Sequence, residues 1–265
     1  MLENSLNKAD WKILLENECK LRGFSRRTLR SYTFFVGKFL DSGQGAREYL
    51  LDLIDNGKSD ETIRLAGFAV KFYLRHVLGQ DAKLEKLPNI RRPKKLPVIL
   101  SKKEIEAMIQ STNNLKHRLV IMLGYSAGLR CSELINLKWS DIDFKRNVIH
   151  VKQSKGKKDR IVMLSPKVKK LLNTYPQTRE GYVFQTRNGT YCPRSVSLII
   201  KSATNRAGIK KKVSPHSLRH AFATHLLENG VSIRVIKELL GHSDIKTTLV
   251  YTKVANVKVE SPIDM

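Results

Sequence analysis

The side chains best able to do chemistry lie close together near the C-terminus, in the run SPHSLRH from Ser214 to His220. Ser214 is a suitable N-cap, and Pro215 suits the first position of a helix. His216 and Arg219 are three residues apart, so a helix places them on one face near its N-terminal end. Free backbone N–H groups and the positive end of the helix dipole favour phosphate there, so we predict a phosphate-binding helix end.

Two other kinds of site fit these residues less well. A zinc site built from His216, His220 and His225 lacks the glutamate of the H-E-x-x-H pattern, and no cysteine lies nearby. The basic run SKGKK at 154–158 lacks the first glycine and the Lys-Ser/Thr pair of a P-loop, and such a loop alone is most often a solvated hairpin. A single histidine or tyrosine near a helix end is also more often packed or exposed than catalytic, so these residues are informative only together.

The order of the polar motifs along the chain is more specific than any one motif. The residues that stand out in them are Arg130, Lys155, His216, Arg219, His242 and Tyr251. This series resembles the tyrosine recombinase family, and the stretch LLGHSDIKTTLVYTKV is especially similar to the Xer-type site-specific recombinases.

The resemblance implies a role for each of these residues at a scissile phosphate. Arg130 and Arg219 match the family's two catalytic arginines, whose charged forks suit phosphate oxygens. Tyr251 matches the nucleophile, and His216 matches the residue that accepts its phenolic proton. His242 matches the second His/Trp position, which donates to the phosphate. The implied product is a 3′-phosphotyrosyl DNA with a free 5′ hydroxyl, formed without ATP, metal or any other cofactor.

Two supporting roles are also implied by the resemblance. Lys155 matches the hairpin lysine that protonates the departing 5′ oxygen. Its neighbours Lys157 and Lys158 leave the choice of lysine within this loop open. Glu133 matches an acidic position that orients an arginine or a histidine.

The charge of the chain fits a protein that binds a polyanion. Its 265 residues include 49 lysines and arginines against 24 acidic residues, a formal net charge of +25. Such a balance is typical of nucleic-acid binding, although a ribosomal-type or simply well-solvated basic surface has the same composition. A hydrophobic share of 41% argues against general disorder.

Membrane insertion and export are not indicated. The longest nearly apolar stretch, Leu119 to Leu129, is about half of the roughly 20 residues that a spanning helix needs. The N-terminus has no basic region followed by an apolar one, and the three cysteines are far apart. We therefore expect a cytoplasmic protein in a reducing compartment.

The elements that position the motifs divide into two parts. The segment 88–97, PNIRRPKKLP, holds three prolines and four cations, which indicates an extended basic linker. Residues 1–90 have a net charge of +3 and residues 91–265 a net charge of +22. With the resemblance, this predicts a helical core-DNA-binding domain over 1–87 and a catalytic domain over 98–265, closing as a C-shaped clamp.

Caps and periodicity predict a mainly α protein with a small β-hairpin. The predicted helices cover 7–21, a segment from Ser25 to Gly43, one capped by Asp60, one after the Ser101–Glu104 capping box, 116–126, 131–137, 214–229, 232–241 and a short one from Ser243 or Asp244 to near Tyr251. The predicted strands are 148–152 and 160–164.

Several cations outside the catalytic motifs are candidate DNA contacts. They are Arg26, Arg27, Arg30, Arg91, Arg92, Lys94, Lys95, Lys157 and Lys158. The first three lie in the opening turns of a predicted helix, where they oppose its dipole. A phosphate-facing helix end explains them, and a solvated face explains them equally well.

The resemblance implies a site-specific recombinase that cuts and rejoins double-stranded DNA in a tetrameric synapse, as in Xer-like resolution of chromosome or plasmid dimers at a dif-like site. The alternatives are a mobile-element integrase, a type IB topoisomerase-like enzyme and a non-catalytic DNA-binding protein. The integrase alternative is weakened because no arm-binding domain precedes residue 1. The sequence leaves open the DNA target, any partner recombinase or accessory protein, and whether the residues after Tyr251 dock in cis or in trans.

Overall fold

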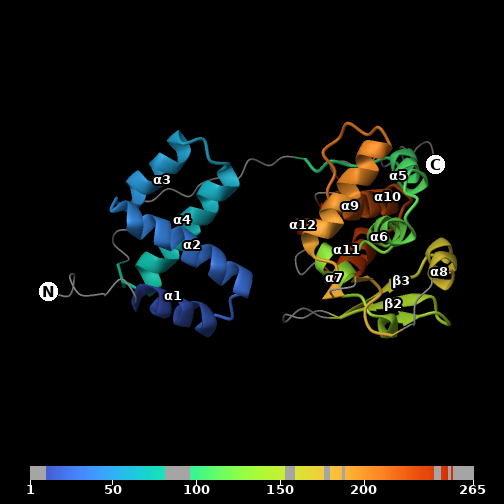
Figure 1. The fold of residues 1–265 in the computed structure, drawn as a ribbon, viewed down its shortest axis with the longest axis horizontal. Helices are drawn as coiled ribbons and strands as arrows, with labels where there is room; N and C mark the ends of the chain where they lie inside the picture. Colours follow the sequence, from blue (N-terminus) through green and yellow to red (C-terminus); the bar gives the residue numbers. More distant parts are fainter. Residues whose placement is uncertain are drawn as a thin grey trace, which may run out of the picture. The chain divides into compact units, whose positions relative to one another are not determined.

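The computed structural model describes residues 10–80, 96–152, 159–175, 180–186, 189–241, 246–249 and 252. These residues are mainly helical with a few short strands, which confirms the predicted mainly α class with a small sheet (Figure 1). The chain divides into two compact units, Met1–Lys94 and Lys95–Met265. The division falls within the proline-rich segment 88–97, while the DNA-binding and catalytic roles of the two parts stay predictions.

The described part of the N-terminal unit is made of four helices. They are α1 (Asp10–Leu21), α2 (Arg26–Ser42), α3 (Ala46–Asp55) and α4 (Asp60–His76). The Ser25 hydroxyl accepts the Thr28 N–H at 3.0 Å and so begins α2 as predicted, and Gly43 ends that helix. The core is apolar, with Val36 of α2 and Val70 of α4 fully buried.

Two details of this unit differ from the sequence prediction. The prediction that Asp60 caps α4 is wrong by one residue, because the Ser59 hydroxyl accepts the Thr62 N–H at 3.3 Å and Asp60 is the first helical residue. Helix α3 was not predicted. Its N-cap is Gly45, which has no side chain to mark the start of a helix.

The second unit holds the remaining described helices and all the described strands. Its helices are α5 (Lys102–Gln110), α6 (Leu115–Ser126), α7 (Cys131–Ile135), α8 (Pro166–Asn173), α9 (Pro193–Arg206), α10 (Pro215–Glu228), α11 (Ile233–Leu240) and α12 (Lys246–Leu249), with a 3-10 turn at Trp139–Asp141. Its strands are β1 (Ile142–Asp143), β2 (Val148–Val151), β3 (Arg160–Met163), β4 (Gln185–Thr186) and β5 (Gly189–Thr190).

The strands form two small antiparallel sheets. The first has the order β1-β2-β3, with Val148 opposite Met163 and Val151 opposite Arg160, which confirms the predicted hairpin strands to within a residue. Strands β4 and β5 pair separately. The predicted helix 131–137 is two residues too long: α7 ends at Ile135, and the Leu137 carbonyl accepts the Val183 N–H at 2.8 Å instead.

The core of this unit gathers around α6, which packs against α10 (Figure 1). The two helices approach closely at Gly124, where an added Cβ would lie 3.2 Å from a methyl of Leu218. The apolar side of α6, including Leu119 and Leu123, is fully buried. Among the described residues, none of the helices combines the length and apolar character needed to span a bilayer.

Candidate active site

Arg130 lies where α6 gives way to α7. The chain turns through Gly128, which has a φ of 59°, and Arg130 becomes the N-cap residue of α7. Its backbone N–H donates to Glu133 Oε2 at 2.7 Å, and its Nη1 donates to Glu133 Oε1 at 2.7 Å. The side chain is 23% exposed, so the Arg130 guanidinium is fixed by Glu133 and still open to an incoming anion.

Arg219 is placed by α10, which begins as predicted with Ser214 as N-cap and Pro215 as the first helical residue. Its side chain is only 4% exposed. Nη1 donates to the Gly128 carbonyl at 2.6 Å, and Nη2 donates to the Leu240 carbonyl. Arg219 Nη1 also lies 3.9 Å from Glu133 Oε2, so one carboxylate lies beside both predicted catalytic arginines.

His216 precedes Arg219 by one helical turn and shares its electrostatic environment. The residue is exposed as a whole, while desolvation of its ring and then the positive charges of Arg219 and Arg130 lower its pKa. His220, with its ring centroid 6.3 Å from that of His216, has a pKa lowered to about 4 by burial and by the charges of His216 and Arg219. The neutral form of both rings therefore predominates at pH 7.

Glu133 joins the arginines into one cluster, and a third arginine that sequence reasoning missed completes it. Arg160 donates from Nη1 to Glu133 Oε1 at 2.8 Å and from Nη2 to Glu133 Oε2 at 2.7 Å. Burial alone raises the pKa of Glu133, but the hydrogen bonds and charge of Arg160, followed by the hydrogen bonds from Arg130, lower it to about 2. Glu133 is therefore an anion throughout the physiological range.

The alternation of buried and exposed residues along β3 is a sequence signal that could have identified Arg160. Val162 and Leu164 are apolar and buried, and Arg160 lies on the same face of the strand two residues earlier. A cation on the buried face of a strand needs a carboxylate partner, which is the signal that points to Glu133.

The end of α11 is the second place where the three arginines meet. Helix α11 begins at the predicted cap Ser232 and ends at Gly241, which has the left-handed φ of 60° expected of a terminating glycine. Three consecutive carbonyls there accept arginine donors: Leu239 from Arg160 Nε at 2.7 Å, Leu240 from Arg219 Nη2, and Gly241 from Arg130 Nη2 at 2.9 Å. Cations at the negative end of a helix are electrostatically favoured.

The remaining predicted site residues are of two kinds. Those outside the described residues are Arg91, Arg92, Lys94, Lys95, Lys155, Lys157, Lys158, His242 and Tyr251. Arg26, Arg27 and Arg30 are described, lie in the first turns of α2 in the N-terminal unit, and are exposed. The structure thus brings together Arg130, Glu133, His216 and Arg219, and the assignments of all the site residues stay predictions.

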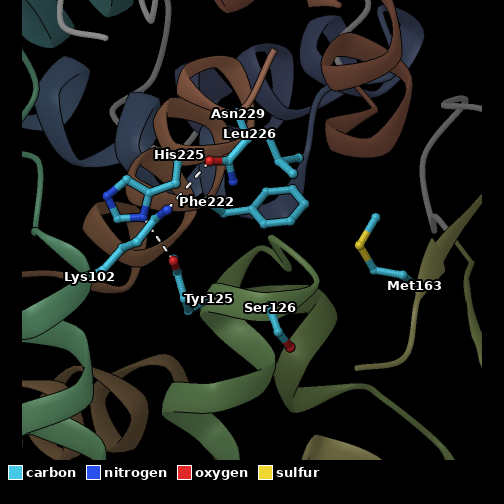
Figure 2. A pocket seen from close by; sticks show the side chains of 8 residues that line it. All are labelled: Lys102, Tyr125, Ser126, Met163, Phe222, His225, Leu226 and Asn229. Atoms are coloured by element: carbon cyan, nitrogen blue, oxygen red, sulfur yellow. Dashed lines mark hydrogen bonds between the residues drawn. The ribbon is translucent and has the colours of Figure 1, made fainter. Parts of the chain in front are cut away.

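A pocket of about 180 Å³ lies on the same unit, against α6 and α10 (Figure 2). It is lined by Lys102, Tyr125, Ser126, Met163, Phe222, His225, Leu226 and Asn229. The Tyr125 hydroxyl and His225 Nδ1 are 2.8 Å apart at one side of it. None of the predicted catalytic residues lines this pocket, so we place the candidate site at the arginine cluster.

The arginine cluster has the chemistry of a phosphate site. Two guanidiniums are held beside a histidine that is neutral at pH 7, and their charge exceeds that of the single carboxylate. Forked, permanently charged donors suit a phosphodiester whose negative charge grows in the transition state. Within the described residues, no group of three or more histidine, cysteine or acidic side chains is arranged to hold a metal ion.

Comparisons with known proteins agree with this chemistry. Residues 99–257 match the phage integrase family. Tyrosine recombinase XerA of Pyrococcus horikoshii is 37% identical over 257 residues, which cover 92% of this chain and 89% of that protein. The crystal structure of XerA recombinase is 29% identical, with a TM-score of 0.57 over 93% of this chain and 94% of that one. XerH bound to a palindromic difH substrate shares the fold, with a TM-score of 0.71 at 21% identity over 93% and 82% of the two chains. The chain therefore belongs to the phage integrase family and is a Xer-like tyrosine recombinase.

Proposed function

We propose that this recombinase cuts DNA one strand at a time with Tyr251 as the nucleophile. The Tyr251 phenolic oxygen attacks the scissile phosphorus, the bond from phosphorus to the 5′ oxygen breaks, and a 3′-phosphotyrosyl bond replaces it. The phenolic proton passes to His216, and Lys155 supplies a proton to the departing 5′ oxygen. Because the new ester retains the energy of the phosphodiester, attack by another 5′ hydroxyl reverses the step and rejoins the strand.

The observation that carries this proposal is the cluster around Glu133. The carboxylate accepts from Arg130 at 2.7 Å and lies 3.9 Å from Arg219, so both guanidiniums are organised before any DNA binds. Pre-organised cations stabilise the phosphorane-like charge without reorganising during the reaction. His242 follows Gly241, whose carbonyl holds Arg130 at 2.9 Å, and we assign it a hydrogen bond to the same phosphate.

His216 suits the role of proton acceptor for an electrostatic reason. Burial and the charges of Arg219 and Arg130 lower its pKa, so the neutral, proton-accepting form predominates at pH 7. The same charges favour ionisation of a phenol brought next to them, because they stabilise the phenolate that attacks. We therefore expect cleavage to slow as the pH falls and His216 becomes protonated.

At the level of the DNA, we propose that the two units close as a C-shaped clamp around the duplex and that four protomers form a synapse. The expected target is a dif-like pair of sites, and the expected outcome is resolution of chromosome or plasmid dimers. Support comes from the relative named XerA and from the related fold of XerH, which was solved on a difH substrate. The basic segment 91–95 and the exposed arginines of α2 are the proposed backbone contacts.

The nucleophile is tested by replacing one phenol with a phenyl ring. On suicide substrates carrying a nick next to the candidate cleavage position, Tyr251→Phe is expected to lose the covalent protein–DNA adduct and keep DNA binding. Tyr182→Phe is the control, because it removes a half-buried phenol of the same unit that lies outside the predicted site. Adduct formation by Tyr251→Phe would overturn the assignment. Absence of adduct from the wild type on every site of a panel would favour a non-catalytic DNA-binding protein.

A second assay separates the enzymatic alternatives. A supercoiled plasmid carrying two directly repeated sites should be resolved into two circles by a Xer-like recombinase. Relaxation without exchange would indicate topoisomerase-like activity. Efficient joining of two unlike sites, with little exchange between identical ones, would favour a mobile-element integrase.

A further inference from the structure

Arg160 has no role in the proposed reaction, yet its surroundings are those of a built site. It opens β3 with its side chain on the buried face, and that side chain is 6% exposed. Its neighbour Ile161, on the other face of the strand, is 52% exposed. A buried guanidinium is costly unless every part of it is paired, so its partners are informative.

All three nitrogens of Arg160 are engaged by two elements distant in sequence. Nη1 donates to Glu133 Oε1 at 2.8 Å and Nη2 donates to Glu133 Oε2 at 2.7 Å. Nε donates to the Leu239 carbonyl at 2.7 Å. This arrangement leaves the guanidinium directed at protein atoms and shielded from solvent. A direct contact with DNA is therefore not its role.

We propose that Arg160 is a positioning residue for strand cleavage: it fixes the Glu133 carboxylate and the last turn of α11, and through them it aims the Arg130 guanidinium at the scissile phosphate. The inference rests on the proposed function, since it requires Arg130 to act on that phosphate. It adds a residue to the machinery that neither the motif series nor the family comparison assigned.

The route from Arg160 to Arg130 is short and runs through two acceptors. Glu133 Oε1 accepts from both arginines, at 2.8 Å from Arg160 and 2.7 Å from Arg130. Arg130 also donates to the Gly241 carbonyl, two residues after the Leu239 carbonyl that Arg160 holds. Losing Arg160 would free the carboxylate to rotate and loosen the helix end, so both anchors of Arg130 would shift.

The fork of the guanidinium is essential to this role. A planar fork holds both carboxylate oxygens at once and fixes the plane of the carboxylate. Lysine at the same position keeps the charge but presents one nitrogen, which cannot hold both oxygens and the Leu239 carbonyl together. The proposal therefore predicts that Arg160→Lys recovers only part of the function that Arg160→Met loses.

The test separates the rate of chemistry from the amount of folded protein. Single-turnover cleavage of a nicked suicide substrate, at saturating enzyme, gives a rate constant and an amplitude, and equilibrium binding is measured on the same DNA. We expect Arg160→Met to cleave about 100-fold more slowly with binding unchanged, the scale expected when a catalytic group is slightly misplaced. Arg160→Lys should fall between it and the wild type. Arg146→Met, which removes an exposed arginine before β2, is the control.

A merely structural role predicts a different pattern. Variants with reduced amplitude and an unchanged rate constant would overturn the proposal, and if Arg160→Met does not fold, Arg160→Lys supplies the same comparison. The double variant Arg160→Met/Arg130→Lys gives a second readout. If Arg160 acts only through Arg130, the double variant should cleave no more slowly than the slower of the two single variants. A cleavage rate constant reduced by the product of the two single-variant factors would overturn the route through Arg130.

Failure of this inference is distinguishable from failure of the proposed function. A wild type that forms no adduct on any substrate overturns the function, and the inference with it. A wild type that forms adduct while Arg160→Met matches its rate constant overturns the inference alone.

Discussion

The two units of this recombinase use charged side chains in opposite ways. Between α2 and α4 of the N-terminal unit, buried residues such as Val36 and Val70 are apolar, and Arg26 and Arg27 lie exposed. In the second unit, by contrast, Arg160 and Arg219 are buried against Glu133 in the midst of the fold.

The difference shows what each arrangement is suited to do. Apolar packing tolerates exchanges of similar volume, so it specifies a fold without fixing any one atom tightly. A buried ion cluster fixes donor and acceptor directions, and it fails sharply when one partner is removed. The buried ion cluster of the second unit therefore fixes the directions of its arginines, whereas the apolar core of the N-terminal unit leaves Arg26 and Arg27 at the surface.

The largest expected effect comes from Glu133→Gln. The change leaves Arg160 and Arg219 buried without their counter-charge, so we expect the free energy of unfolding of the second unit to fall by about 3–5 kcal/mol. Urea denaturation measures it. Glu106→Gln, on the exposed side of α5, is the matched control. Equal losses in the two variants would contradict the stabilising role given to the buried ion cluster of the second unit.

Gly128→Ala is expected to have the next largest effect. At a φ of 59°, the added Cβ would lie 2.5 Å from a ring carbon of Phe222, so conformational strain and overlap together should destabilise the protein by about 2–4 kcal/mol. Gly208→Ala has a similar φ of 67° with no atom within 4 Å of its Cβ. It should lose only about 1 kcal/mol in the same measurement. Equal losses would show that strain alone decides both positions.

A smaller effect is expected from pH. The pKa of His220 is about 4 in the folded protein and 6.5 in its reference state. Between these pH values the unfolded chain binds a proton that the folded protein does not, so the free energy of unfolding is at its full value above pH 6.5 and falls as the pH drops toward 4. At pH 5.5 the loss should be about 1 kcal/mol. His220→Gln should flatten this part of the stability profile. The same titration of His150→Gln shows how much any histidine substitution changes it, and identical profiles for the two variants would refute the assignment.

The smallest effect is expected at the surface of the N-terminal unit. If Arg26 contacts phosphate, Arg26→Gln should lower the slope of log affinity against log salt by about 1. It should also stabilise α2 by about 0.3–1 kcal/mol, because a cation in the first turn opposes the helix dipole. Arg47→Gln, in the first turn of α3, is the control, since it shares the second effect and is not a proposed DNA contact. An unchanged salt slope would remove Arg26 from the DNA contacts.

The helix starts that can be predicted from the sequence are those set by interactions between residues close together in the chain. Caps join residues three apart, so Ser25, the Ser101–Glu104 box, Ser214 and Ser232 were all found as helix starts. The start of helix α3 cannot be predicted in this way, because its glycine N-cap makes no side-chain hydrogen bond. The Asp60 error arose because Ser59 and Asp60 are both good caps and stand side by side.

The sequence motifs predict which residues form the site, but not most of the bonds that hold those residues in place. The resemblance supplied Arg130, Glu133, His216 and Arg219 as members of one site, and the structure brings these four together. Apart from the pair of Arg130 with Glu133, which are three residues apart, the bonds that organise them are not predictable, because they span 27 residues from Arg160 to Glu133 and 111 from Arg130 to Gly241. The roles of His242, Tyr251 and Lys155 stay predictions.

One feature of the arginine cluster bears on how the site is inherited. Arg219 holds the carbonyls of Gly128 and Leu240, and Arg130 holds that of Gly241, so these acceptors belong to the main chain. A main-chain oxygen keeps its chemistry whatever side chain its residue carries. Neighbouring side chains can therefore diverge among relatives without releasing the arginines, provided that the path of the chain through the two glycine turns is kept. Apart from the Glu133 carboxylate, which contacts Arg130 and lies beside Arg219, the positions of both guanidiniums are therefore encoded in turn geometry.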